Sequence, residues 1–189
     1  MSFSSRIKEE LSRHMSPARH CQIAEIAAIL SLCGRIQISG DDHYSIKIHT
    51  ENVTVARKCF TLLRKTFNIE TKIFVRENSH LKRVKVYTIE ITDPEEIQVI
   101  FQALRLVTNS IDQGTLVLSD MLVVQQNCCK RAFIRGAFLA SGSISDPEKG
   151  YHFEIVCSDA KRAEQLQTII RSFSVDAKIV QRKKSHVVY

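Results

Sequence analysis

The run Ile134-Arg135-Gly136-Ala137-Phe138-Leu139-Ala140-Ser141-Gly142-Ser143-Ile144 has an earlier, weaker copy in the same chain. That copy reads Ala28-Ile29-Leu30-Ser31-Leu32-Cys33-Gly34-Arg35-Ile36. Each run is an apolar helix pattern that ends at a glycine. The similarity extends over residues 21–78 and 129–184, where Cys21 aligns with Cys129 and Arg76 with Arg182. A repeat of this length predicts two similar lobes related by a pseudo-two-fold axis.

Each copy predicts the same order of elements. The first copy predicts helices over 21–33 and 53–67, strands over 35–39, 44–51, 70–76 and 84–92, a turn at 40–42 and a closing helix after Asp93-Pro94. The second predicts a helix to Ser141, a turn at 146–150, strands over 151–157 and 175–182, and between them a helix from Asp159 to Phe173. The expected fold class is α+β with two αββαββα lobes, the second truncated within its fourth strand.

The repeat also predicts how the 189 residues are divided. Residues 1–20 form an amphipathic helix, because Phe3, Ile7, Leu11 and Met15 recur at helical spacing. Residues 21–106 form the first lobe, 107–127 connect the lobes, and 128–189 form the incomplete second lobe. We therefore expect further chain beyond residue 189.

The charge of the chain favours a polyanionic partner. The chain has 27 Lys and Arg against 20 Asp and Glu, a net charge of +7, with the cations concentrated in residues 57–85 and 128–189. Clustered positive charge points first to nucleic acid. The most apolar run, residues 23–33, contains Glu25 and is too short to span a bilayer, and no signal peptide precedes it. We expect a cytoplasmic protein without a membrane partner.

The six cysteines do not predict a metal site. Four of them, Cys21, Cys33, Cys59 and Cys157, lie in apolar patterns, where free cysteine acts as a small buried hydrophobe. No cysteine pair has the two-to-four-residue spacing of a zinc site, and the adjacent Cys128-Cys129 has no His or Cys nearby in sequence. His14, His20 and Cys21 alone are a weak ligand set, so we predict no metal and no cofactor.

Small residues recur four positions apart in both glycine-terminated helices. Such a stripe allows two helix backbones to approach closely, which would join the lobes at their shared axis. The alternative is that alanine simply favours helices. The residues expected at the interface between lobes are Ala24, Ala28, Gly34, Ala132, Gly136, Ala140 and Gly142.

The run from Ile134 to Ile144 resembles the signature helix of LAGLIDADG homing endonucleases. In those enzymes the residue before the final glycine of each copy is an acid, and the two acids together hold a divalent metal over the DNA. The corresponding residues here are Cys33 and Ser141, neither of which offers the anionic oxygen that Mg²⁺ requires. The resemblance therefore implies an endonuclease-like fold without catalytic residues.

A closer resemblance covers the whole chain. The segments Met1-Ser2-Phe3-Ser4, Lys8-Glu9-Glu10-Leu11, Thr50-Glu51-Asn52-Val53 and Lys130 to Pro147 are similar to the amino-terminal domain of the bacterial WhiA family. This resemblance implies a degenerate, non-catalytic endonuclease fold followed by a helix-turn-helix domain beyond residue 189. It also implies a nucleoid-associated regulator of transcription, linked to sporulation, cell division and chromosome segregation, that binds duplex DNA mainly through the helix-turn-helix domain.

Alternation along the strands suggests where DNA would lie. Lys72 and Arg76 share one face of their strand, and Lys178 and Arg182 share the corresponding face in the other lobe. The other candidates for DNA contact are Lys47, His49, Lys82, Arg83, Lys85, Lys183 and Lys184. The alternative is that an uncovered sheet face is polar in any case.

Three functions remain open at this level. The favoured one is a DNA-binding regulatory domain without catalysis. The second is an active nuclease, against which the missing acids argue. The third is a platform on which the former DNA-binding face docks a regulatory protein partner or another domain of the same protein.

Overall fold

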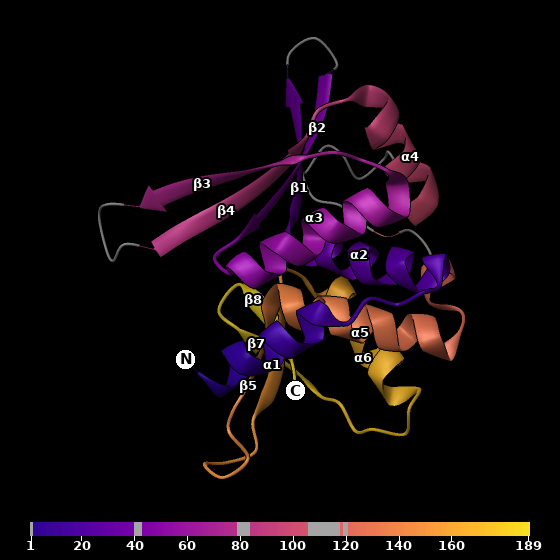
Figure 1. Ribbon diagram of the computed structural model, residues 1–189. Helices are drawn as coiled ribbons and strands as arrows, with labels where there is room; N and C mark the ends of the chain where they lie inside the picture. The colour runs from indigo at the N-terminus through magenta and orange to yellow at the C-terminus, as the bar shows by residue number, and fades with distance from the viewer. Residues whose placement is uncertain (1, 40–42, 79–83, 106–117, 119–120) are drawn as a thin grey trace.

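The computed structural model describes residues 2–39, 43–78, 84–105, 118 and 121–189 (Figure 1). The α-helices are α1 (Phe3–Arg13), α2 (Arg19–Cys33), α3 (Val53–Phe67), α4 (Pro94–Leu104), α5 (Asn127–Ser141) and α6 (Ala160–Arg171), and η2 (Met121–Val124) is a short 3-10 helix. The strands are β1 (Gly34–Ser39), β2 (His43–Thr50), β3 (Lys72–Asn78), β4 (Val84–Ile91), β5 (Gly142–Ile144), β6 (Phe153–Cys157), β7 (Ile179–Arg182) and β8 (Ser185–Val188).

Both lobes build the same four-stranded antiparallel sheet. The strand order is β1-β2-β4-β3 in the first lobe and β5-β6-β8-β7 in the second. In each sheet the central pair brings together strands that a helix separates in sequence, β2 with β4 around α3 and β6 with β8 around α6. This shared topology confirms the predicted α+β fold of two αββαββα-type lobes.

Capping side chains start three helices where the sequence predicts. Asn52 accepts a hydrogen bond from the backbone N–H of Thr54 at the start of α3. Asp93 accepts bonds from the first turn of α4, and Asp159 accepts one from the backbone N–H of Arg162 in α6. Each cap satisfies amide groups that a helix cannot pair internally, which explains why short polar residues mark these boundaries.

The second lobe departs from the predicted boundaries. Strand β7 begins at Ile179 rather than at residue 175, because the side chains of Gln167 and Arg171 both donate to the carbonyl of Ala177 and hold that segment against α6. Strand β6 begins at Phe153, and α6 ends at Arg171, two residues short of the prediction. The predicted turn at residues 40–42 lies outside the described residues.

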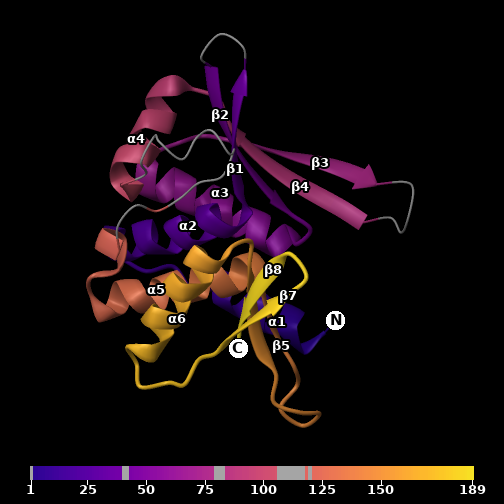
Figure 2. The ribbon, with the colours of Figure 1, turned by 180° about the vertical axis from the view of Figure 1, so that it is seen from behind.

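The helix pair α2 and α5 forms the centre of the molecule. Figures 1 and 2 show these helices side by side, with the first sheet and the second sheet on opposite sides of the pair. Ala24, Ile26, Ala28 and Ile29 of α2 are completely buried, and α5 contributes Leu139 to the same continuous core. The two lobes therefore share one core. None of the described helices is long and apolar enough to cross a membrane.

Candidate nucleic-acid interface

The two central helices cross at Gly136. A Cβ atom added at Gly136 would lie 2.3 Å from the carbonyl oxygen of Glu25 and 3.1 Å from the Cβ of Ala28. Ala24, Ala28 and Ala132 are buried along the same contact, whereas Ala140 is half-buried near the end of α5. Gly34 and Gly142 end the two helices and begin the first strand of each lobe. Because the small residues allow α2 and α5 to pack closely, the first strands of the two lobes, which follow these helices directly, begin near the axis that relates the lobes.

A buried ion-pair network spans this crossing. The Glu25 carboxylate, which is fully buried on α2, accepts a hydrogen bond of 2.9 Å from Arg135 of α5. Its other oxygen, Oε1, lies 3.1 Å from the ammonium of Lys58. The geometry of this pair is not that of a hydrogen bond, so the interaction between Glu25 and Lys58 is an ion pair. Burial lowers the pKa of Lys58, and the Glu25 carboxylate opposes that shift. Sequence reasoning missed this network, because Glu25 resembled an interruption in an apolar run.

Cys33 and Ser141, the residues before the two helix-ending glycines, lie at the carboxyl ends of α2 and α5. The Cys33 thiol donates to the carbonyl of Ala140 at 3.5 Å, and burial raises its pKa to about 11. Ser141 has a buried hydroxyl oxygen without a hydrogen-bond partner among the described residues. Lys8 of α1 lies near Cys33 and places its ammonium 5.8 Å from the centre of the Phe138 ring. The group beside these helix ends is therefore a lysine rather than a carboxylate, and burial lowers the pKa of its ammonium.

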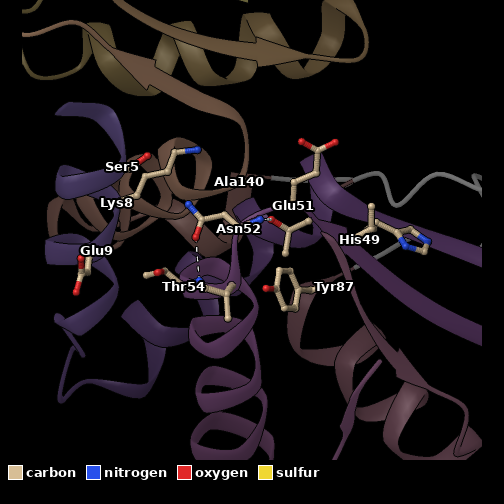
Figure 3. Close-up of a pocket in the computed structure, with 12 residues that line it drawn as sticks. Ser5, Lys8, Glu9, His49, Glu51, Asn52, Thr54, Tyr87 and Ala140 are labelled. Atoms are coloured by element: carbon tan, nitrogen blue, oxygen red, sulfur yellow. Dashed lines mark hydrogen bonds between the residues drawn. The ribbon is translucent and has the colours of Figure 1, made fainter. Parts of the chain in front are cut away.

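A cleft of about 720 Å³ opens beside these helix ends. Figure 3 shows Lys8 of α1 and Asn52 on one side of the cleft and His49 and Tyr87 on the other. Ala140 at the end of α5 forms part of its floor. Helix α1 thus covers the helix ends from which a LAGLIDADG enzyme would present its acids.

The open face of the first sheet carries a row of charged side chains. Pairing places Arg35 opposite Lys47, Lys47 opposite Glu90, and Glu90 opposite Lys72. Alternating residues such as Ile46, Ile48 and Ile89 are buried on the other face, against the helices. Lys47 forms an ion pair of 3.0 Å with Glu90. Three cations and one acid therefore cross the open face from edge to edge.

His49 lies among these cations. Burial is the main cause that lowers its pKa, and Lys47, Arg35 and Arg76 lower it further. Its Nδ1 atom lies 3.0 Å from the hydroxyl of Thr88. We call the group Arg35, Lys47, His49, Lys72 and Arg76 the basic face. Four of its five members are predicted from the sequence as DNA-contact candidates. Sequence reasoning missed Arg35, although its position next to the buried Ile36 in an alternating strand could have indicated it.

The corresponding face of the second lobe is less basic. Arg182 lies on the open face of β7 and forms an ion pair of 3.2 Å with Glu154, and Lys178 directly precedes the strand. Lys178 lies 3.9 Å from the carboxylate of Asp176. Lys183 and Lys184 are exposed in the turn between β7 and β8. Lys178 and Arg182 thus each have an acid beside them.

The candidate contact residue Lys85 lies on the other face of β4. Lys85 points to the opposite face of β4 from Glu90 and pairs with Glu77 at 3.3 Å, so it does not join the row of charges on the open face. The physical reason is strand parity, because residues 86, 88 and 90 take the open face and residue 85 cannot share it. Lys82 and Arg83 lie outside the described residues.

The paired sheets and crossed helices define a LAGLIDADG-like protein. The chain aligns with the homing endonuclease I-DmoI in complex with DNA and Mn at a TM-score of 0.56 and 12% identity, over 90% of this chain and 88% of that one. It aligns with the N-terminal LAGLIDADG domain of DUF199/WhiA at a TM-score of 0.72 and 19% identity, over 99% and 82%. At these identities the similarity concerns the fold.

The family follows from the sequence matches. Residues 19–107 match the WhiA N-terminal LAGLIDADG-like domain, and residues 130–189 match the WhiA LAGLIDADG-like domain. The chain belongs to the WhiA family. It is 51% identical over 189 residues to the probable cell division protein WhiA of Lachnoclostridium phytofermentans, and 39% identical over 192 residues to that of Desulforamulus reducens. The whole chain aligns with about 60% of the length of these relatives.

Proposed function

We propose that this chain is the non-catalytic, DNA-associated domain of a nucleoid-bound regulator in the cytoplasm. The regulator would act in transcription and cell division, and through them in sporulation and chromosome segregation. The observation that carries this proposal is the basic face, where four cations accompany His49 on an uncovered sheet. Phosphate contacts made by such cations position a protein on a duplex without reading its sequence. Base specificity would belong to a helix-turn-helix domain beyond residue 189.

Duplex affinity at two salt concentrations tests this function. We expect the 189-residue chain to bind unrelated duplexes with similar affinity, and the binding to weaken as salt rises, because released counterions drive phosphate contacts. The full-length protein should bind its preferred site more tightly than the fragment binds any duplex. Absence of salt-dependent binding by the fragment would contradict the proposal.

The same proposal predicts no DNA cleavage. Cys33 and Ser141 offer no carboxylate, and the Lys8 ammonium opposes a metal ion at that end of the helix pair. Supercoiled plasmid incubated with the protein and Mg²⁺ or Mn²⁺ should remain supercoiled. Nicking that persists through purification, and that Cys33→Ala or Ser141→Ala abolishes, would restore the nuclease hypothesis.

A protein-docking function is favoured by one other observation. Phe74, Val180 and Tyr189 expose 47%, 41% and 52% of their surface, and Phe74 and Val180 lie on the open sheet faces. Exposed aromatic and apolar side chains are typical of protein interfaces. If Phe74→Ser left DNA affinity unchanged but abolished binding of the separately expressed carboxy-terminal part of the protein, the open face would be a docking surface instead.

A further inference from the structure

Four metal-binding side chains meet at the amino-terminal ends of the central helices. His20 and Cys21 belong to the first turn of α2, and Cys128 and Cys129 belong to the first turn of α5. One ligand atom from each residue lies within 4.8 Å of the other three. Helix packing thus gives Cys128 and Cys129 the His and Cys neighbours that are absent around them in the sequence.

We propose that His20, Cys21, Cys128 and Cys129 bind one Zn²⁺ ion. Zinc in structural sites takes four ligands in tetrahedral geometry, and three cysteines with one histidine are an established ligand set for it. Harder cations such as Mg²⁺ and Ca²⁺ prefer oxygen ligands, which this cluster does not offer.

The distances fit a tetrahedral site after a small contraction. Zinc bond lengths of about 2.3 Å to sulfur and 2.0 Å to nitrogen place neighbouring ligand atoms about 3.5–3.8 Å apart. The Nδ1 atom of His20 lies 3.1 Å from the Cys129 sulfur and 3.5 Å from the Cys21 sulfur. No ligand pair is further apart than 4.8 Å, so rotamer adjustments of about 1 Å are sufficient.

Burial raises the pKa of the Cys21 and Cys129 thiols in the metal-free protein, so a bound Zn²⁺ ion would displace their protons, and the helix ends would stabilise the thiolates that result. Thiolates are the metal-binding form of cysteine, and helix amino termini stabilise negative charge there. His20 and Cys21 lie in the first turn of α2, and Cys128 and Cys129 lie in the first turn of α5, so the positive ends of both helix dipoles are at the cluster. Two helix dipoles would thus act on three thiolates.

Two of the four ligands are buried and two are exposed, so the site is anchored in the protein interior and is also accessible to an ion from solvent. Cys21 and Cys129 are 4% and 5% exposed, whereas His20 and Cys128 are exposed to solvent. A cleft of about 330 Å³, lined in part by His20 and Cys129, reaches the cluster from the surface. Because two ligands come from each lobe, the ion would clamp the lobes together at the end of the helix pair opposite Cys33 and Ser141. This role does not depend on DNA binding.

Metal content and cobalt absorption test the proposal on the 189-residue chain. Protein stripped with a chelator under reducing conditions should take up about one equivalent of Zn²⁺, and its melting temperature should rise because the ion binds only the folded state. Co²⁺ in its place should give the strong visible absorption of tetrahedral coordination together with thiolate charge-transfer bands. Zinc uptake far below one equivalent, or cobalt spectra without charge transfer, would overturn the proposal.

Variants assign the ligands. His20→Ala and Cys128→Ser change exposed residues, so they should fold, and each should weaken Zn²⁺ affinity by more than the roughly 10–100-fold that removal of an outer partner causes. Cys157→Ser, a thiol on β6 outside the cluster, is the matched control and should retain full affinity. Equal weakening in the control would overturn the assignment. So would a Cys21–Cys129 disulfide in the purified protein whose reduction restores no metal binding.

Discussion

The two lobes share one strand order, but their open faces differ in charge. The strands of the first sheet are six to eight residues long and carry the basic face. Those of the second are three to five residues long, and Glu154 pairs with Arg182 there. The sheet faces that pack against the helices are similar in the two lobes, with Ile48 and Ile155 buried at corresponding positions. Packing constrains core residues in both copies, whereas the solvent-facing positions are free to diverge.

The largest expected effect concerns the network that joins the lobes. Glu25→Gln leaves the buried Lys58 and the partly buried Arg135 without a counter-charge, which should lower the free energy of unfolding by about 3–5 kcal/mol. Chemical denaturation measures this change. The matched control replaces Glu25, Lys58 and Arg135 together by Met. That triple variant should recover most of the stability, because no unpaired charge remains. An unchanged midpoint for Glu25→Gln would mean that the lobes are not coupled through this network.

A smaller destabilisation should follow from separating the helices at their crossing. Gly136→Leu places side-chain atoms where the backbone of Glu25 already lies, and overpacking of this kind costs about 1–3 kcal/mol. Thermal unfolding should show a lowered melting temperature, while Ala160→Leu, at an exposed position of α6, should leave it nearly unchanged. If the two variants melted alike, close packing at Gly136 would not hold the lobes together.

Charge reversal in each lobe then tests the asymmetry of the open faces. In the full-length protein, Lys72→Glu with Arg76→Glu should weaken duplex binding more than Lys178→Glu with Arg182→Glu, because Glu154 already offsets Arg182. The dependence of log affinity on log salt should flatten by about 0.9 for each phosphate that the protein no longer neutralises. Both variants should affect all duplex sequences alike. Equal effects from the two lobes would contradict the inferred difference in charge between the two open faces. No effect from either variant would favour the protein-docking function.

The smallest effect should be a pH dependence confined to the first lobe. The pKa of His49 is lowered by burial and by neighbouring cations, so the side chain is neutral near pH 7. Acidification protonates it and adds a charge to the basic face, which should strengthen duplex binding. The same step should lower stability, because the unfolded chain binds that proton more readily. His49→Gln should remove both trends, and an identical pH profile in that variant would assign them elsewhere.

Much of the fold could be predicted from residues close together in sequence. Asn52, Asp93 and Asp159 mark helix starts because a cap acts on amides two or three residues away. Alternation placed Lys72 and Arg76 on one face for the same local reason. The face taken by Lys85 follows only from the strand pairing, in which it lies opposite Glu77.

The sequence by itself determined the two-lobe plan, since a repeat with matching periodicity encodes the same elements twice. It also determined the absence of the acids, because Cys33 and Ser141 are read directly from aligned positions. Only the tertiary structure decided which distant side chains meet. Glu25 reaches Lys58 and Arg135, and His20 reaches Cys129, because the α2–α5 crossing brings them together. Local periodicity contains no information about such contacts, which depend on how whole helices pack.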